Sequence, residues 1–177
     1  MSVRDERRRA VLARTADHLL EQGLAGASLR PMAAAAGTSD RMLLYYFADR
    51  DELLAATLEE VAARMAGMLA AAGGSEPRPY PVLLREVWAA FRAPAFRPYL
   101  SLWLEVAAGA ARGQEPYRGV GGAIADGFLA WAGERLFVER EEERAPQAAL
   151  LLATIDGLAL LDAVGRGAAA EAALSAS

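Results

Sequence analysis

Residues 28–47 read SLRPMAAAAGTSDRMLLYYF, and this stretch decides the fold. Ser28 is a favourable N-cap for a helix over residues 29–36, and Ser39 is one for a helix over 40–46. Only a three-residue turn separates them. Two helices this close cross steeply, which requires small side chains at the crossing and a turn residue that tolerates unusual backbone angles. The four alanines and Gly37 meet both requirements, so we predict a helix-turn-helix.

The flanking sequence supplies a helix on each side of this motif. Apolar residues recur every four positions from about residue 4 to residue 22, and Gly23 stands where a C-cap belongs. After Phe47, Asp49 can cap a further long helix, with Glu52 completing a variant of the capping box. We expect that helix to reach about residue 72 and to be broken by Gly73, Gly74 and Ser75.

The rest of the chain also predicts helices. Alanine and leucine dominate and β-branched residues are scarce, which favours an all-α protein of about eight or nine helices. The expected helix over residues 146–164 is apolar nearly all round and therefore needs cover on more than one side, for which a partner chain is the economical choice. The alanine-rich tail from Gly167 is expected to be frayed.

Charge is distributed unevenly along the chain. The whole chain has a net charge of −4, yet residues 1–50 contain eight Arg against six Asp or Glu. The remaining residues contain eleven Arg against seventeen acids. A basic cluster can neutralise DNA phosphates, although short basic patches are also common on ordinary surfaces. Four of the N-terminal arginines lie in one short arm: Arg4, Arg7, Arg8 and Arg9.

Several classes of protein are disfavoured. The chain has no cysteine and one histidine, so we expect no metal and no cofactor, and it lacks the common catalytic and nucleotide-binding motifs. The N-terminus does not resemble a signal peptide, and Asp156 and Asp162 interrupt the longest apolar stretch, so we expect a cytoplasmic protein without a membrane span. A helical enzyme is an unfavoured alternative. An interaction module whose helix-turn-helix no longer binds DNA stays open.

The order and spacing of residues 28–39 and 43–53, after the first helix, resemble the N-terminal domain of the TetR family of transcriptional regulators. The resemblance implies a three-helix DNA-binding domain over residues 1–48 and a helical effector-binding and dimerisation domain over 49–177. The family usually has an aromatic residue, often a tyrosine that touches phosphate, where Leu44 stands, and valine where Thr38 stands. Whether that phosphate contact is lost or has passed to Tyr45 is open.

The resemblance and the side-chain chemistry together imply a DNA interface. Arg41 matches the two acceptors on the major-groove edge of guanine, and Asp40 either accepts from cytosine or, as we favour, orients Arg41. The residues expected toward the groove are Thr38, Asp40, Arg41, Met42 and Tyr45. The residues expected at phosphates are Ser28, Arg30, Ser39, Tyr46 and Arg50.

The resemblance further implies a homodimer on a near-palindromic operator, with half-sites roughly 34–36 Å apart, and release by a small-molecule effector. The two long helices over about 117–138 and 146–164 would form the dimer interface. Interface candidates, each of which could equally fill the chain's own core, are Phe128, Trp131, Leu151, Ile155 and Leu158. Effector candidates, with the same alternative for the aromatics, are Met65, Trp88, Phe91, Tyr99, Trp103 and Glu105.

Overall fold

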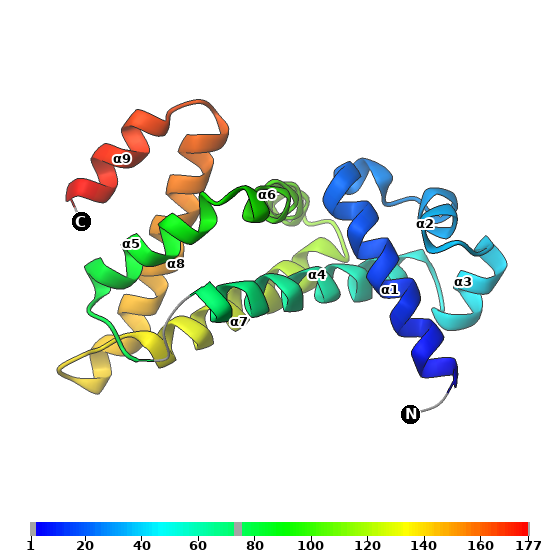
Figure 1. The fold of residues 1–177 in the computed structure, drawn as a ribbon, viewed down its shortest axis with the longest axis horizontal. Helices are drawn as coiled ribbons and strands as arrows, with labels where there is room; N and C mark the ends of the chain where they lie inside the picture. The colour runs from blue at the N-terminus through cyan, green and yellow to red at the C-terminus, as the bar shows by residue number, and fades with distance from the viewer. Residues whose placement is uncertain (1–2, 73–75, 177) are drawn as a thin grey trace. The chain divides into compact units, whose positions relative to one another are not determined.

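The computed structural model describes residues 3–72 and 76–176, and within them every regular element is a helix (Figure 1). The predicted break at Gly73, Gly74 and Ser75 lies outside the described residues. The nine α-helices are α1 (Val3–Gln22), α2 (Leu29–Ala36), α3 (Asp40–Tyr46), α4 (Arg50–Ala72), α5 (Tyr80–Phe91), α6 (Arg97–Ala111), α7 (Tyr117–Arg135), α8 (Arg144–Ala163) and α9 (Gly167–Ala176). The all-α class expected from composition is therefore confirmed for these residues.

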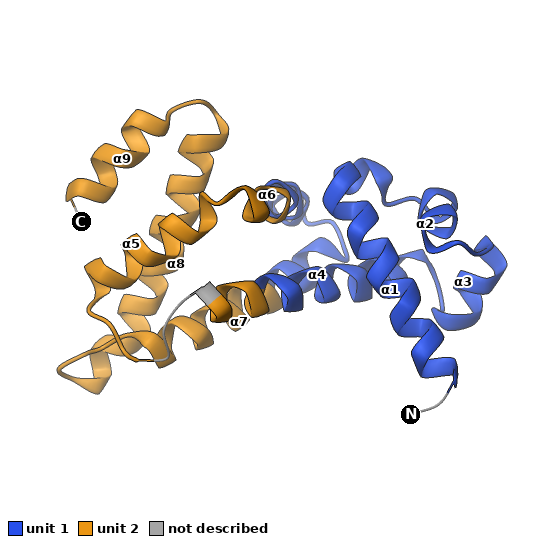
Figure 2. Cartoon of the chain, viewed as in Figure 1, with its two compact units in different colours: residues 1–65, 101–122 blue, residues 66–100, 123–177 orange. Residues whose placement is uncertain are grey.

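The chain divides into two compact units, coloured separately in Figure 2. The first comprises residues 1–65 and 101–122, and the second comprises residues 66–100 and 123–177. The boundaries fall inside α4, α6 and α7, so the units are not consecutive stretches of sequence.

In the first unit, α1, α2 and α3 enclose an apolar core that the start of α4 completes. Ala33 and Ala36 are buried where α2 meets its neighbours, which is the use we predicted for the small side chains. Each short helix also has one large anchor: Met32 on α2 and Leu43 on α3 are fully buried. Phe47 is buried directly after α3, and Leu53 is buried in the second turn of α4.

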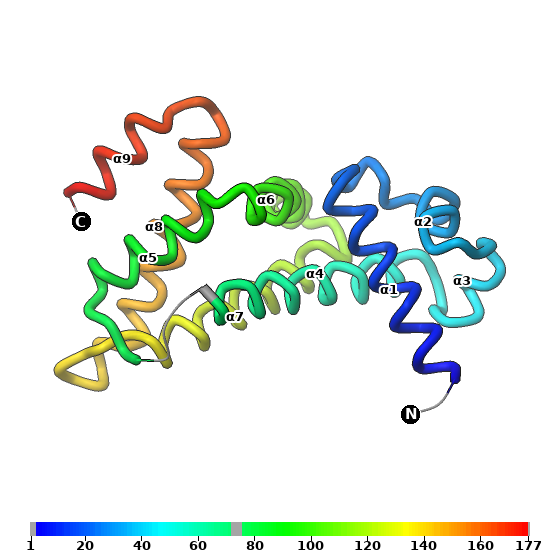
Figure 3. Tube along the Cα trace, in the orientation of Figure 1, coloured from blue at the N-terminus to red at the C-terminus, as the bar shows by residue number. Residues whose placement is uncertain are grey.

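In the second unit, α8 packs against both α5 and α9, and the tube in Figure 3 traces this path. The segment before α5 pairs with the end of α7, because Arg78 donates its backbone N–H to the Arg135 carbonyl at 2.7 Å and accepts from the Phe137 N–H at 2.8 Å. The segment Glu141–Ala163 is long and apolar enough to cross a membrane by length and composition alone, a test that core helices of soluble proteins also pass.

The expectation of a frayed tail was wrong. Residues from Gly167 form α9, whose Ala170 is buried and whose Glu171 pairs with Arg92 near the end of α5. The turn before it is made by Gly165 at φ +75°, a backbone conformation that glycine adopts without strain. An alanine-rich segment with no obvious apolar stripe is therefore held by packing against α8 rather than by its own pattern.

Candidate DNA-binding site

The turn between α2 and α3 has the geometry that the sequence predicts. Gly37 ends α2 in the left-handed conformation, at φ +66°, and its N–H donates to the carbonyls of the preceding turn. The Thr38 N–H donates to the Ala33 carbonyl at 3.0 Å, which completes the cap. Ser39 then caps α3, with its Oγ accepting from the Met42 N–H at 3.3 Å. Ser28 precedes α2 in an extended conformation, but its side chain makes no capping bond.

Arg14 of α1 closes this turn from outside the motif. Its guanidinium donates to the Ala36 carbonyl at 2.9 Å, which satisfies a carbonyl that the end of α2 leaves without a helical partner. The same guanidinium lies 2.9 Å from the position that a Cβ on Gly37 would occupy. The turn therefore needs glycine at position 37 both for its backbone angle and for the space next to Arg14.

The face of α3 opposite its buried anchor Leu43 is exposed. Thr38 and Tyr46, at the two ends of the helix, are half-buried. The other candidates for DNA contact on or before α3 are all exposed, namely Ser39, Asp40, Arg41, Met42 and Tyr45. Leu44 is exposed as well, although we had not placed it among the contacts.

Two of the basic residues at the start of the chain stack on aromatic rings in or directly after α3. Helix α1 begins at Val3, so the four arginines expected in an arm lie in its first two turns. The Arg4 guanidinium stacks over the Tyr45 ring with its central carbon 5.2 Å from the ring centroid. Arg8 stacks over the Phe47 ring at 4.7 Å. The N-terminal positive charge is thus held next to α3 by cation–π contacts.

The start of α4 forms the predicted capping box in a modified form. The Asp49 carboxylate accepts from the Glu52 N–H at 2.8 Å, and the Glu52 carboxylate accepts from the Ala48 N–H at 2.5 Å. Arg50, a phosphate candidate, donates to the Ala27 carbonyl at 3.1 Å and pairs with Asp51 at 2.9 Å. Two further phosphate candidates, Ser28 and Arg30, are also exposed. Arg50 therefore also ties the start of α4 to the segment before α2.

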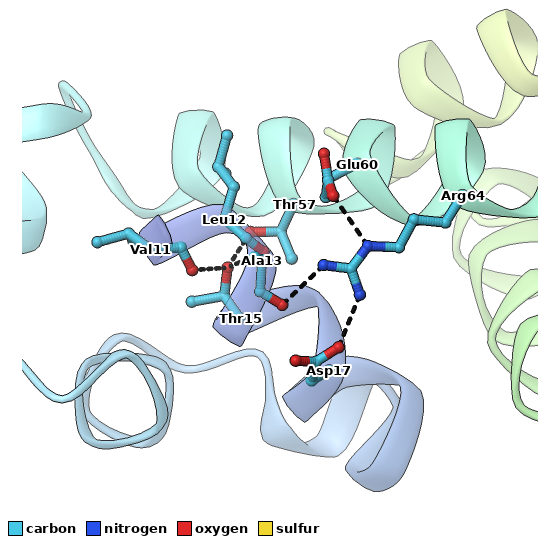
Figure 4. Close-up of polar contacts among 8 residues, drawn as sticks. All are labelled: Val11, Leu12, Ala13, Thr15, Asp17, Thr57, Glu60 and Arg64. Carbon is cyan, nitrogen blue, oxygen red and sulfur yellow. Dashed lines mark hydrogen bonds and ion pairs between the residues drawn. The ribbon is translucent and has the colours of Figure 1, made fainter. Parts of the chain in front are cut away.

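A polar cluster fastens α4 to α1 (Figure 4). The Arg64 guanidinium donates to the Ala13 carbonyl at 3.0 Å, to Asp17 at 2.6 Å and to Glu60 at 2.8 Å. Partial burial alone would lower the pKa of Arg64, but its hydrogen bonds to Asp17 and Glu60, and their charges, outweigh burial and raise the pKa above its ordinary value. Arg64 therefore keeps its charge throughout the accessible pH range.

Two turns of α4 before Arg64, a pair of buried hydroxyls joins the same two helices. The hydroxyls of Thr15 and Thr57 are 3.0 Å apart, and both side chains are fully buried. Each hydroxyl also lies within hydrogen-bonding distance of a carbonyl in its own helix. Neither this threonine pair nor Arg64 was predicted from the sequence. The local signal for Arg64 is its four-residue spacing from Glu60.

Comparison with known proteins agrees with this geometry. The model of a family described as bacterial regulatory proteins, tetR family, matches residues 11–57, which span α1 to the start of α4. These residues are therefore similar to the N-terminal DNA-binding domain of the TetR family. A comparison with curated proteins finds no match.

Solved structures of TetR-like regulators match nearly the whole chain. A protein described as a TetR-family transcriptional regulator from Rhodococcus sp. is 22% identical with a TM-score of 0.76, over 97% of this chain and 96% of that chain. The multidrug binding protein EbrR complexed with proflavin is 24% identical with a TM-score of 0.71, over 96% of each chain. A transcriptional regulator from Saccharomonospora viridis in complex with choline is 18% identical with a TM-score of 0.70, over 97% of this chain and 93% of that chain.

The effector candidates fall into both units. Met65, Trp103 and Glu105 belong to the first unit. The exposed Glu105 carboxylate accepts from the Leu24 N–H at 2.7 Å, so it already has a partner within its own chain. The structure therefore gives the Glu105 carboxylate an internal role that the sequence did not indicate.

The other effector candidates, Trp88, Phe91 and Tyr99, belong to the second unit. Trp88 and Phe91 are buried. Phe96, which we had not selected, lies between Phe91 and Tyr99, with ring centroids 5.4 Å from the first and 6.4 Å from the second. Within the described residues the buried Nε1–H of Trp88 has no hydrogen-bond acceptor.

The candidates for a dimer interface fall into two groups by burial. Leu151, Ile155 and Leu158 are almost fully buried within their own chain. These three side chains therefore fill the chain's own core, which was the alternative to an interface. Phe128 and Trp131 are half-buried, with their ring centroids 5.5 Å apart. If a partner chain packs along α8, its contacts would come from other side chains.

An apolar groove of about 770 Å³ lies where the end of α7 meets the start of α8. Leu129, Phe137 and Ala148 contribute to its walls. Arg144 lies at its edge and is fully engaged, donating to the carbonyls of Gly133 and Leu136. None of the effector candidates lines this groove.

Proposed function

We propose that this regulator is a homodimeric repressor that binds a near-palindromic operator and is released from it by a small molecule. The exposed face of α3 carries the proposal: Arg41 and Tyr45 stand opposite the buried Leu43, and Arg4 stacks on Tyr45. A surface helix with a planar donor fork in its first turn and positive charge beside it suits the major groove. The capped turn and the contacts from α1 hold the helix rigidly enough to read bases.

The exposed side of α8 supports the dimer. Its exposed small and apolar residues follow a spacing of three and four, which is the repeat of a helix-pairing seam. They are Leu150, Ala153, Gly157, Leu160 and Val164. Leu150 and Leu160 are 54% and 53% exposed, and the small residues between them let a second helix approach closely. A second copy of this chain is the occupant we propose, with the half-buried Phe128 and Trp131 of α7 at the edge of the contact.

Two observations support a small-molecule effector. EbrR and the Saccharomonospora viridis regulator, both of similar fold, are complexed with proflavin and with choline. Within the described residues the buried indole N–H of Trp88 has no acceptor, and a buried donor without an acceptor is one to which a ligand can bind. We therefore keep Trp88, Phe91 and Tyr99 as the leading effector candidates. Since the proposed target is DNA, we place the protein in the cytoplasm.

Selection from random DNA duplexes tests the proposal. Purified protein should enrich a near-palindromic sequence, and its affinity should fall steeply as salt rises because phosphate contacts release counterions. If no sequence is enriched at any salt concentration, the repressor proposal fails and the interaction module with a degenerate helix-turn-helix gains. A sedimentation measurement on the same sample should show a dimer at micromolar concentration.

The variant Arg41→Ala tests the central contact. Losing a bidentate bond to guanine should relax the preference at one position of each half-site, by about 5-fold to 150-fold between guanine and the other bases. The measurement is a repeat of the selection with the variant. A uniform loss of affinity for all duplexes would instead place Arg41 at a phosphate. Arg30→Ala is the matched control, because Arg30 is a phosphate candidate and its loss should lower affinity without altering the selected sequence.

A further inference from the structure

Leu44 is an exposed alkyl side chain on the helix proposed to read DNA. It is 46% exposed, whereas its neighbour Leu43 is fully buried. Leucine gains nothing from water at this position, and its alkyl side chain cannot donate a hydrogen bond to phosphate. On the proposed binding face it can therefore offer only an apolar contact.

The geometry of α3 separates its exposed residues into two flanks. Successive side chains of a helix are rotated by about 100°, so Arg41 and Tyr45 lie opposite Leu43 while Met42 and Leu44 lie on opposite sides. Tyr46 falls on the same side as Met42, and Asp40 falls on the same side as Leu44, each pair being four residues apart.

The groups that can bind phosphate gather on one of these flanks. Tyr45 and Tyr46 carry hydroxyls, their rings pack edge to face at 5.2 Å, and Arg4 stacks on the outer one. The opposite flank carries a carboxylate and an alkyl chain, from Asp40 and Leu44, and neither can bind a phosphate. We infer that the Tyr46 flank faces the DNA backbone and that the Leu44 flank faces the edges of the bases.

The major groove offers one apolar group, the C5-methyl of thymine. We propose that Leu44 contacts a thymine methyl next to the guanine read by Arg41, and so selects thymine at that operator position. Arg41 and Leu44 are three residues apart and lie on adjoining parts of the same face, so their base partners are close neighbours. The inference rests on the proposed function, because it requires that α3 enter the major groove.

Deoxyuridine, which lacks only the methyl group, provides the test. In the operator obtained by selection, each thymine of a half-site is replaced in turn by deoxyuridine, and affinity is measured for the full-length protein. One thymine should respond with a loss of about fourfold per half-site, the contribution of one buried methyl. The other thymines near the Arg41 guanine should respond little.

The variant Leu44→Ala links that response to the side chain. It should bind the methylated and unmethylated duplexes equally at the sensitive position, while Met42→Ala, on the opposite flank, should retain the fourfold difference there. Leu44 is exposed, so the variant should unfold at the same temperature as the wild type. Two results would overturn the inference: no thymine that responds to deoxyuridine, or an undiminished response in Leu44→Ala. Both leave the selected operator intact, whereas failure of the selection itself removes the proposed function.

Discussion

Helices α3 and α8 each expose large apolar side chains, yet their surroundings differ. On α3 the exposed Leu44 lies within a turn of Arg41, and Arg4 stacks on the neighbouring Tyr45. On α8 the exposed Leu150 and Leu160 alternate with alanine and glycine at the spacing of a pairing seam. An apolar face bordered by guanidinium groups suits a polyanion with methyl groups in its groove, whereas an apolar face bordered by small residues suits another helix.

The two helices are also held differently. In addition to its buried apolar anchors, the helix-turn-helix is held by arginines that donate to backbone carbonyls, Arg14 to Ala36 and Arg50 to Ala27. Helix α8 is held by buried apolar side chains, with Leu151 and Ile155 facing its own unit. A helix that reads bases must hold its side chains in fixed directions, and hydrogen bonds are directional. A helix that pairs with a partner instead needs a large contact area, which apolar packing supplies.

The substitution Leu160→Arg should have the largest effect, because it places an unpaired charge in the centre of the proposed seam. We expect the dimer dissociation constant to rise at least about a hundredfold, which corresponds to about 3 kcal/mol, with loss of operator binding. Analytical ultracentrifugation across micromolar concentrations measures it. Val82→Arg is the matched control, since Val82 is exposed on α5, and it should remain dimeric. A dimer of unchanged strength in Leu160→Arg would show that the seam is not the interface.

The variant Arg64→Met should have the next largest effect. Methionine keeps much of the aliphatic stem but removes two hydrogen bonds between α4 and α1 and a third, to Glu60, within α4, so we expect a loss of about 1–3 kcal/mol in unfolding free energy. Urea unfolding measures the loss. Arg92→Met breaks only the exposed pair with Glu171 and should cost less than about 0.5 kcal/mol. Equal losses of unfolding free energy in the two variants would mean that the polar contacts of Arg64 do not hold α4 to α1.

The variant Leu44→Arg introduces arginine on the exposed face of α3, as Leu160→Arg does on α8, and we expect a smaller effect. The protein should remain dimeric, because α3 is not in the seam. The added charge should steepen the salt dependence of DNA binding by about one unit of slope per subunit, since one more counterion is released. Affinity measured between low and high salt checks this. Dissociation of the dimer would contradict the contrast between the two faces.

The motif was predictable because its signals are local. Gly37 and Ser39 specify the turn through their own backbone preferences, and Asp49 with Glu52 specifies the start of α4. The attachment of α4 to α1 was not predictable from the sequence. Arg64 lies 51 residues from Ala13, and nothing in the spacing reveals that contact. An apolar pattern also cannot distinguish a core from an interface, which is why residues such as Leu151 were ambiguous until their burial was known.

The smallest effect concerns the charged segment before α8, where Glu141 lies exposed. Its hydrogen bond from Arg144, and that residue's charge, lower the pKa of Glu141 despite some desolvation. A carboxyl group with a lowered pKa in the folded state contributes stability above its ordinary pKa and loses it as pH falls through the folded value. Glu141→Gln should therefore lose slightly less stability than the wild type when pH is lowered from 7 to 3. Urea unfolding at both values measures the difference.

An equal acid response in the two proteins would mean that the ion pair contributes nothing to folding. Arg144 keeps its bonds to the carbonyls of Gly133 and Leu136 in this variant, so the end of α7 stays attached to α8. The dimer should be unaffected as well, because Glu141 lies outside the seam. A change in dimer strength in Glu141→Gln would extend the interface to the groove beside Phe137, and the contrast with α3 would then rest on charge as well as on apolar contact.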